Sequence, residues 1–433
     1  MENKALKWYK LDNSAKIYPI LISDRYTYVF RLSAILTEVV DPEILYQAIT
    51  ESRNRFPSFF VTLKRGFFWY YFEENLQDPV LEKETNYACE KIHEHRNRKY
   101  QFRFLYYNKR ISLEINHVLT DGGGALVFLN AIIYRYLELI GKDVFPDESV
   151  ILLDSEIDPA EQEDSFIKNY SGGPLNPPKL PKAYFNKRKL FKKFGSGVIN
   201  SFIDSAELKA LAYKSSASIT QYIVALLTYA TIKTGNKKLL DKYPVNVCVP
   251  VNLRGKYGSK TLSNFSLFFH TSYKSLPNLD FESILTKVKQ DFKEEYSEEK
   301  IQSKLDTVCV VQEKMLFKLI PLFVKYFFLK IGYNTFGRRP TSITISNFGL
   351  IKTPKAMEPF IESFSFYMGS AVKTAVAVNS YKGKTSIVFS RACVNTNLEE
   401  AFFSFLTEQG LQVEIVSNFW ELHEKKYKKL RKG

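Results

Sequence analysis

The sequence predicts an α/β fold with mixed sheets, arranged as two halves of similar size. The chain has 433 residues, about three times the ~150 residues of a typical domain, so two large domains or one duplicated architecture is expected. Strand-like and helix-like patterns alternate in both halves. Between the halves lies a segment with the composition of a linker.

The composition narrows the class of protein and of partner. With 45% hydrophobic and 25% charged residues, the chain is a folded globular protein rather than a disordered one. Its 35 Phe and 27 Tyr suit broad sheets and an apolar cavity. The net charge of +15 attracts polyanions, which include phosphorylated cofactors and anionic lipid headgroups. Because the basic residues are spread out and no recognition motif accompanies them, we expect no nucleic acid partner.

Cysteine and histidine spacing gives no sign of a disulfide framework or a metal site. The four cysteines are far apart and form no CxxC pair. The His93-Glu94-His95 run lies in a charged stretch, where a solvated surface is expected. We therefore expect no metal. The N-terminus lacks the apolar stretch of a signal peptide, and no window of ~18 uncharged apolar residues occurs, so we expect a cytoplasmic protein.

The first half opens with a strand and then a helix. Residues 26–36 are rich in β-forming side chains, and Asp41-Pro42-Glu43 supplies an N-cap, a first-turn proline and a second acid for the helix. Two hairpins follow, at 59–72 with a turn near Arg65-Gly66, and at 101–115 with a turn at Asn108-Lys109. Apolar residues then recur at helical spacing over 125–140, and Gly141 ends that helix.

The linker precedes a second series of strands and helices. Residues 146–164 hold eight acids and no basic residue, and four prolines and a basic run follow. We predict an N-terminal lobe at 1–170, a crossover linker at 171–195 and a C-terminal lobe at 196–433. In the last, helices are expected from Asp204 and over 220–232 and 398–409, and strands at 244–251, 341–345, 373–379 and 385–392.

One apolar segment can be interpreted in two ways. Residues 314–330 mix Phe, Leu and Val with four lysines. We expect this segment to pack on the core or to line a channel, as most amphipathic helices of globular proteins do. Contact with a membrane surface is the alternative.

The most informative segment is a strand-to-helix corner, Asn116-His117-Val118-Leu119-Thr120-Asp121-Gly122-Gly123-Gly124. Three glycines allow a sharp turn, close approach of a ligand and positive φ. A histidine, with its ordinary pKa near 6.5, suits general-base catalysis. We expect Asp121 to fix the corner by pairing with an arginine rather than to orient His117. On these residues alone, a turn with an incidental histidine remains the alternative.

The run from His117 to Gly122 resembles the HxxxDG motif of the chloramphenicol acetyltransferase-like superfamily, which includes condensation domains and alcohol acetyltransferases. Similar segments follow the superfamily's order over most of the chain: Asp41-Pro42-Glu43 with Arg55-Phe56-Pro57, Val249-Pro250-Val251-Asn252-Leu253-Arg254, Leu262-Ser263-Asn264-Phe265 and Ser346-Asn347-Phe348-Gly349. Condensation enzymes commonly have two adjacent histidines, and here Asn116 stands at the first position. This departure favours simple acyl transfer over peptide condensation.

The resemblance implies two chloramphenicol acetyltransferase-like lobes with a channel between them and the histidine at its midpoint. It implies an acyltransferase that moves an acyl group, in the first place acetyl, from acyl-CoA to a hydroxyl or amine acceptor without a covalent intermediate. His117 is then the general base, and Asp121, Gly122 and Arg254 are structural, with Arg254 the partner of Asp121. Candidates for oxyanion or substrate binding are Gly123, Asn116, Ser346 and Asn347, although Ser346 and Asn347 can equally cap a turn.

Two other functions remain open. One is a stand-alone condensation-like enzyme whose thioesters are tethered to a carrier protein, which would then be a partner. The other is a non-catalytic two-lobe binding protein, against which the joint presence of His117, Asp121, Gly122 and Arg254 argues. In the preferred interpretation the protein is a monomer that takes a small-molecule acyl acceptor.

Overall fold

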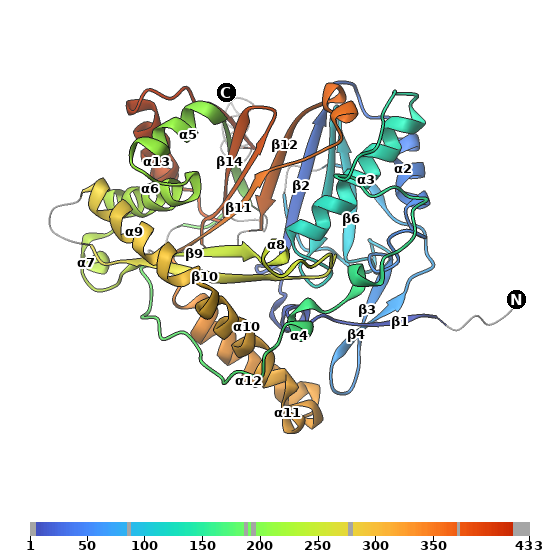
Figure 1. Cartoon of the computed structure of the whole chain (residues 1–433), viewed down its shortest axis with the longest axis horizontal. Helices are drawn as coiled ribbons and strands as arrows, with labels where there is room; N and C mark the ends of the chain where they lie inside the picture. Colours follow the sequence, from blue (N-terminus) through green and yellow to red (C-terminus); the bar gives the residue numbers. More distant parts are fainter. Residues whose placement is uncertain are drawn as a thin grey trace, which may run out of the picture.

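The computed structural model describes residues 6–84, 88–185, 189–191, 196–275, 280–369 and 373–418. Two α/β halves lie side by side, the N-terminal half in blue and cyan and most of the C-terminal half in green to red (Figure 1). Each half has a sheet that combines parallel and antiparallel neighbours. The predicted α/β fold with mixed sheets in two halves is confirmed.

The five-stranded sheet of the N-terminal half has the order β12-β2-β7-β6-β5. Its strands are β12 (Ile361–Met368), β2 (Val29–Leu36), β7 (Arg110–Asn116), β6 (Phe102–Tyr107) and β5 (Leu81–Lys83). The turn predicted at Asn108-Lys109 joins β6 to β7, and Asn108 takes a φ of 50°, a conformation that asparagine tolerates.

A smaller sheet of the order β1-β4-β3 lies beside it, formed by β1 (Trp8–Lys10), β4 (Tyr70–Glu74) and β3 (Val61–Arg65). The predicted hairpin is present, with a wider turn than expected at Arg65-Gly66. The Gly66 N–H donates to the Trp69 carbonyl at 3.0 Å, so the turn spans 66–69 and β4 begins at Tyr70.

Helix α2 (Pro42–Glu51) begins at the expected cap, whereas α3 (Gly122–Leu139) begins three residues before the predicted apolar run. The Asp41 carboxylate accepts from the Glu43 and Ile44 N–H groups at the start of α2, as N-cap residues do. The long helix α3 is followed by Gly141 at a φ of 77°. A short 3₁₀ turn, η1 (Ala15–Ile17), leads into α1 (Tyr18–Leu21). Phe59 stacks on Phe128 of α3 within the buried core of this half.

The C-terminal half contains a seven-stranded sheet of the order β10-β9-β11-β13-β14-β8-β15. Its strands are β10 (Ser266–Tyr273), β9 (Val245–Asn252), β11 (Ile343–Leu350), β13 (Ala375–Tyr381), β14 (Lys384–Arg391), β8 (Gly197–Asp204) and β15 (Glu414–Ser417). The helices of this half are α5 (Ser205–Lys214), α6 (Ile219–Thr234), α7 (Lys237–Leu240), α9 (Phe281–Glu295) and α13 (Asn397–Glu408). The buried side chains of α6 join this sheet in a second core.

A separate helical segment lies at the lower edge of Figure 1. It comprises α10 (Glu298–Glu313), α11 (Met315–Leu319), α12 (Leu322–Gly332) and a π-helical turn, η3 (Tyr333–Arg338). The remaining short elements are η2 (Pro159–Gln162), α4 (Ser165–Lys168), α8 (Arg254–Tyr257) and η4 (Lys355–Phe360). Among the described helices, none is long and apolar enough to cross a membrane.

The two halves share strands. The described residues of the predicted linker, 171–185 and 189–191, contain neither helix nor strand. Strand β12 follows β11 in the sequence but pairs with β2, with Tyr367 opposite Arg31. The C-terminal part of the chain thus completes the N-terminal sheet. The lobe boundaries at 170 and 196 stay predictions, and residues 419–433 of the last range lie outside the described residues.

Candidate active site

His117 lies at the corner between β7 and α3, and its main chain is held from two sides. Its N–H donates to the Tyr28 carbonyl at 2.9 Å, from the residue that precedes β2. Its carbonyl accepts from the Asn264 amide at 3.0 Å, from the loop between β9 and β10. The backbone of His117 is therefore fixed jointly by segments of both halves.

Two aromatic rings orient the imidazole. Tyr18 of α1 stacks on it at 5.2 Å between ring centroids, and Phe30 of β2 lies at 4.6 Å. The residue is half-buried, and Nδ1 is buried without a close hydrogen bond. Burial lowers the pKa of His117 below its usual value of 6.5, against the opposing effect of Asp121. The ring is therefore neutral near pH 7 and able to accept a proton.

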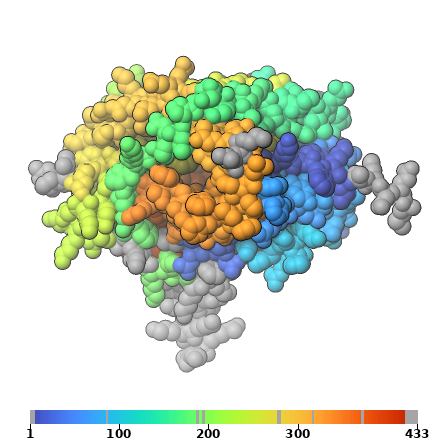
Figure 2. Space-filling model, turned by 90° about the horizontal axis from the view of Figure 1, so that it is seen from below, coloured from blue at the N-terminus to red at the C-terminus, as the bar shows by residue number. Residues whose placement is uncertain are grey.

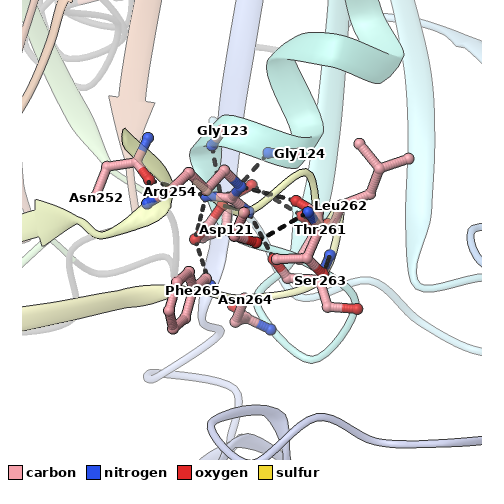
Figure 3. A network of polar contacts seen from close by, with 12 residues as sticks. Asp121, Gly123, Gly124, Asn252, Arg254, Thr261, Leu262, Ser263, Asn264 and Phe265 are labelled. Atoms are coloured by element: carbon pink, nitrogen blue, oxygen red, sulfur yellow. Dashed lines mark hydrogen bonds and ion pairs between the residues drawn. The ribbon is translucent and has the colours of Figure 1, made fainter. Parts of the chain in front are cut away.

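Asp121 is the N-cap of α3 and lies at the centre of a buried polar network (Figure 3). Its carboxylate accepts from the Gly123 N–H at 3.0 Å, the Gly124 N–H at 3.3 Å and the Phe265 N–H at 2.8 Å. Arg254 contacts it at 2.8 Å. Burial alone would raise the pKa of Asp121, but Arg254 and these hydrogen bonds hold it below the usual value.

Arg254 reaches Asp121 from the start of α8, just after β9, so the expected pair is present. Its Nε donates to the Thr261 carbonyl at 2.8 Å, and Nη2 donates to the Ser263 carbonyl at 2.6 Å. Figure 3 shows the guanidinium enclosed by this loop and the first turn of α3. The contact joins the start of α3 to the C-terminal half.

The glycines at the start of α3 serve close packing. A Cβ atom at Gly122 would lie 2.1 Å from Cζ of Phe348, and one at Gly124 would lie 2.2 Å from the Leu262 carbonyl oxygen. The expectation of positive φ here is wrong, because all three residues are in the first turn of a right-handed helix. The Gly123 N–H already donates to Asp121, so it is not free for an oxyanion while Asp121 caps the helix.

The other candidate residues mainly shape turns. The Asn116 side chain accepts from the Val118 N–H at 3.0 Å. The Asn347 amide donates to Thr220 at 2.8 Å and its oxygen accepts from the Gly349 N–H at 2.8 Å, which matches the turn-capping alternative. Ser346 is half-buried on β11, opposite Ala377. Within this element, Phe348 is the side chain that packs against Gly122.

Sequence reasoning missed several residues that support His117 but are far from it in the sequence. Asp12 is buried and accepts from the Ala15 N–H at 2.7 Å and the Asn264 amide at 2.9 Å. Burial raises the pKa of Asp12 to about 7. Tyr28 takes a φ of 52° while its carbonyl holds His117. Asn264 lies in a matched motif, whereas Asp12, Tyr18 and Tyr28 carry no local signal that links them to the site.

Known proteins with the same fold place these observations in context. No protein-family model matches the chain, and no curated protein has a significantly matching sequence. Polyketide synthase associated protein 5 from Mycobacterium tuberculosis is similar, with a TM-score of 0.57 at 14% identity over 94% of this chain and 98% of that one.

Two further solved structures are similar at comparable level. Trichothecene 15-O-acetyltransferase from Fusarium sporotrichioides has a TM-score of 0.57 at 11% identity, over 92% of this chain and 93% of that one. The starter condensation domain of rhizomide synthetase also has a TM-score of 0.57 at 11% identity, over 92% and 94%. The chain thus has the two-lobe fold of the acetyltransferase and condensation-domain group, as the HxxxDG resemblance predicted.

Proposed function

We propose that this chain is an acyltransferase that moves an acyl group from acyl-CoA to a hydroxyl or amine acceptor, with His117 as the general base. The observation that carries the proposal is the setting of His117, a half-buried neutral imidazole held between two aromatic rings where both halves meet. A base in this state can take a proton near neutral pH.

The reaction needs one base and no enzyme-bound intermediate. His117 Nε2 takes the acceptor proton while the acceptor oxygen or nitrogen attacks the thioester carbonyl carbon. The tetrahedral intermediate collapses as its C–S bond breaks, and the imidazolium returns the proton to the departing CoA thiolate. The ester or amide and free CoA-SH leave, and His117 is neutral again. Ser346 is kept as the candidate for stabilising the oxyanion, because Gly123, Asn116 and Asn347 already take part in a helix cap or in turns.

Buried thiols support direct transfer. Cys89 and Cys248 are buried, and burial raises the pKa of Cys248 to about 12 and that of Cys89 further still. Both thiols are therefore protonated near neutral pH and are poor nucleophiles. Acyl transfer through either of these cysteines is disfavoured.

The solved structures of similar fold support a CoA thioester as donor. One is named an acetyltransferase, another holds coenzyme A together with T-2, and a third holds C8-CoA. Acetyl is the donor group to test first. The condensation domains in the same group keep a carrier-protein donor as the second candidate.

The test is release of free thiol from acetyl-CoA and longer acyl-CoA thioesters in the presence of alcohols or amines. We expect acceptor-dependent release that falls by roughly 10²–10⁴ in His117→Ala, the contribution of a general base. His95→Ala is the matched control, because His95 is exposed and distant in sequence from the site; its rate should equal that of the unaltered chain.

The remaining outcomes separate the alternatives. Release from an acyl-carrier protein but from no CoA thioester would favour the condensation-like enzyme. Turnover that survives His117→Ala would remove His117 from the mechanism. Tight binding of CoA thioesters, with no turnover of any donor, would favour the non-catalytic binding protein.

A further inference from the structure

Helix α12 turns its aromatic side chains outward. Phe323, Phe327 and Phe328 are 65%, 63% and 59% exposed, and Phe327 packs edge-on against Phe328. Further exposed apolar side chains adjoin them along the chain or at the neighbouring hairpin turn. We call this set the aromatic patch: Phe67, Leu319, Phe323, Phe327, Phe328 and Ile331.

The buried residues of α12 are Leu322 and Lys325, so the inner face of this helix includes a lysine. Lys325 is fully buried and donates to the Phe68 carbonyl at 3.1 Å and the Lys318 carbonyl at 3.2 Å. Its ammonium lies 3.9 Å from the centre of the Trp69 ring, and burial lowers the pKa of Lys325 to about 8. An ordinary surface helix presents its charges to water and its apolar face to the core. In α12, by contrast, a lysine is buried while three phenylalanines face the solvent.

The chain segment that holds most of the patch carries only positive charges. No acidic residue occurs between Glu313 and Glu358, a stretch that contains eight lysines and arginines. Lys314, the N-cap residue of α11, and Lys330, in the last turn of α12, are exposed. Aromatic residues bordered by lysines on a non-spanning helix are typical of a segment that lies in the interface of an anionic membrane.

We propose that the aromatic patch docks this protein onto an anionic lipid surface, with α12 in the plane of the interface. Figure 2 looks onto this side, where the orange segment that contains α12 lies beside the blue N-terminal residues. A second copy is a less suitable occupant, because a two-fold interface would bring the same lysines together from both subunits.

The docking helix is connected to the site. At its C-terminal end it continues into η3, where Tyr333 packs edge-on against Tyr28 at 6.2 Å. The Tyr28 carbonyl holds the His117 N–H, and α12 also contacts α1, which carries Tyr18. A docked molecule therefore has a short structural path from the lipid surface to His117. Docking itself does not depend on the proposed function.

The test is co-flotation of the full chain with lipid vesicles. We expect it to float with vesicles of phosphatidylcholine and phosphatidylserine at low salt, and much less with phosphatidylcholine alone. Phe323→Ser with Phe327→Ser should lower the partition coefficient at least about tenfold, because two exposed phenyl rings no longer enter the interface. Lys314→Gln with Lys330→Gln should lower it about fivefold for each charge removed.

Phe145→Ser is the matched control, since Phe145 is 70% exposed but lies in an acidic stretch; its partition should be unchanged. The altered side chains are exposed, so melting curves should coincide with that of the unaltered chain. Failure of the unaltered chain to float with anionic vesicles would overturn the proposal, and so would equal flotation of the phenylalanine pair variant. A dimer in solution that this variant dissociates would assign the patch to a second copy instead.

Discussion

His117 owes its orientation to its backbone and to ring packing rather than to a carboxylate. The neighbouring acid, Asp121, is fully engaged by Arg254 and by N–H groups at the start of α3 and at Phe265. Asp121 therefore acts on the histidine by its negative charge and not by a hydrogen bond. The protonation of His117 is then governed mainly by burial, which favours the neutral ring.

The pH dependence of turnover tests this. Protonated His117 cannot accept a proton, so activity is lost as pH falls through the pKa of the base. Because burial lowers that pKa, we expect kcat/KM to be constant around neutral pH. We expect it to fall only at more acidic pH, with a midpoint below about 6.5. Initial rates of thiol release across pH, at limiting acceptor, give this midpoint.

Asp12 is a second group near the site that titrates in this range, since burial raises its pKa to about 7. It is linked to His117 through Asn264, whose amide donates both to Asp12 and to the His117 carbonyl. Asp12→Asn separates the two contributions, because the amide does not titrate. If a limb at or above pH 6.5 persists in Asp12→Asn, the lowered pKa of His117 is contradicted.

Removal of Arg254 should lower the stability of the protein as well as its activity. In Arg254→Ala the buried Asp121 carboxylate loses its cation, at a cost of about 3 kcal/mol in the free energy of unfolding. Urea unfolding followed by circular dichroism measures this. Arg135→Ala is the control, because Arg135 pairs with Glu51 on the surface at 2.6 Å and should cost less than about 1 kcal/mol. Equal stability of the two variants would show that the Asp121 pair is not structural.

Local sequence was sufficient for some site residues and insufficient for others. His117, Asp121 and Arg254 lie within short motifs whose residue types state their chemistry, so they could be named before the structure was known. Asp12 and Tyr18 reach the site only because the N-terminal segment folds against the loop that carries Asn264. No periodicity or spacing encodes that contact.

At the scale of elements, the first turn of α3 and strand β11 are fitted to each other. The Phe348 ring covers the position where Gly122 lacks a side chain, and it packs against Phe366 of β12 at 4.3 Å. The glycine run of the motif is thus explained by a neighbouring aromatic ring and not by unusual backbone angles. The SNFG element contributes this ring.

Gly122→Ala should therefore be destabilising although alanine favours helices. The new methyl group would overlap the Phe348 ring. The shifts needed to remove such an overlap lower the free energy of unfolding by about 1–3 kcal/mol. Denaturant unfolding of Gly122→Ala, Phe348→Leu and the double variant measures the coupling; the double variant should be more stable than the sum of the single losses. In the control Gly255→Ala, no atom lies within 4 Å of the new Cβ, and stability should be unchanged. Additive losses in the cycle would contradict the contact.

Helix starts were predictable from sequence, whereas strand partners were not. Asp41 and Asp204 cap α2 and α5 as their residue types indicate. Strand β12 went unpredicted, since nothing in residues 361–368 specifies pairing with β2 in the other half. The outward aromatic face of α12 was also unexpected, because packing on the core was the preferred interpretation. There the buried contacts of Lys325 decide which face points inward.

At the scale of the whole molecule, the site belongs to neither half alone. Strand β12 completes the N-terminal sheet, Arg254 anchors the N-cap of α3, and Asn264 holds the carbonyl of His117. These contacts come from two segments of the C-terminal part, the connection between β9 and β10 and strand β12. The position of His117 therefore depends on how the two halves are joined, and so does the position of α12 relative to the site.

That arrangement predicts a difference between dissolved and membrane-embedded acceptors, provided the proposed function holds. With an apolar alcohol incorporated in anionic vesicles, the unaltered chain should release thiol at least about tenfold faster than Phe323→Ser with Phe327→Ser, because the variant no longer concentrates on the lipid surface. With a water-soluble alcohol and no vesicles, the two should be equally active, since both substituted side chains are exposed. Lack of turnover by either protein with either acceptor would count against the proposed acyltransferase activity. Equal rates of the two proteins on the embedded alcohol would leave that activity intact and count only against the role of docking in reaching the acceptor.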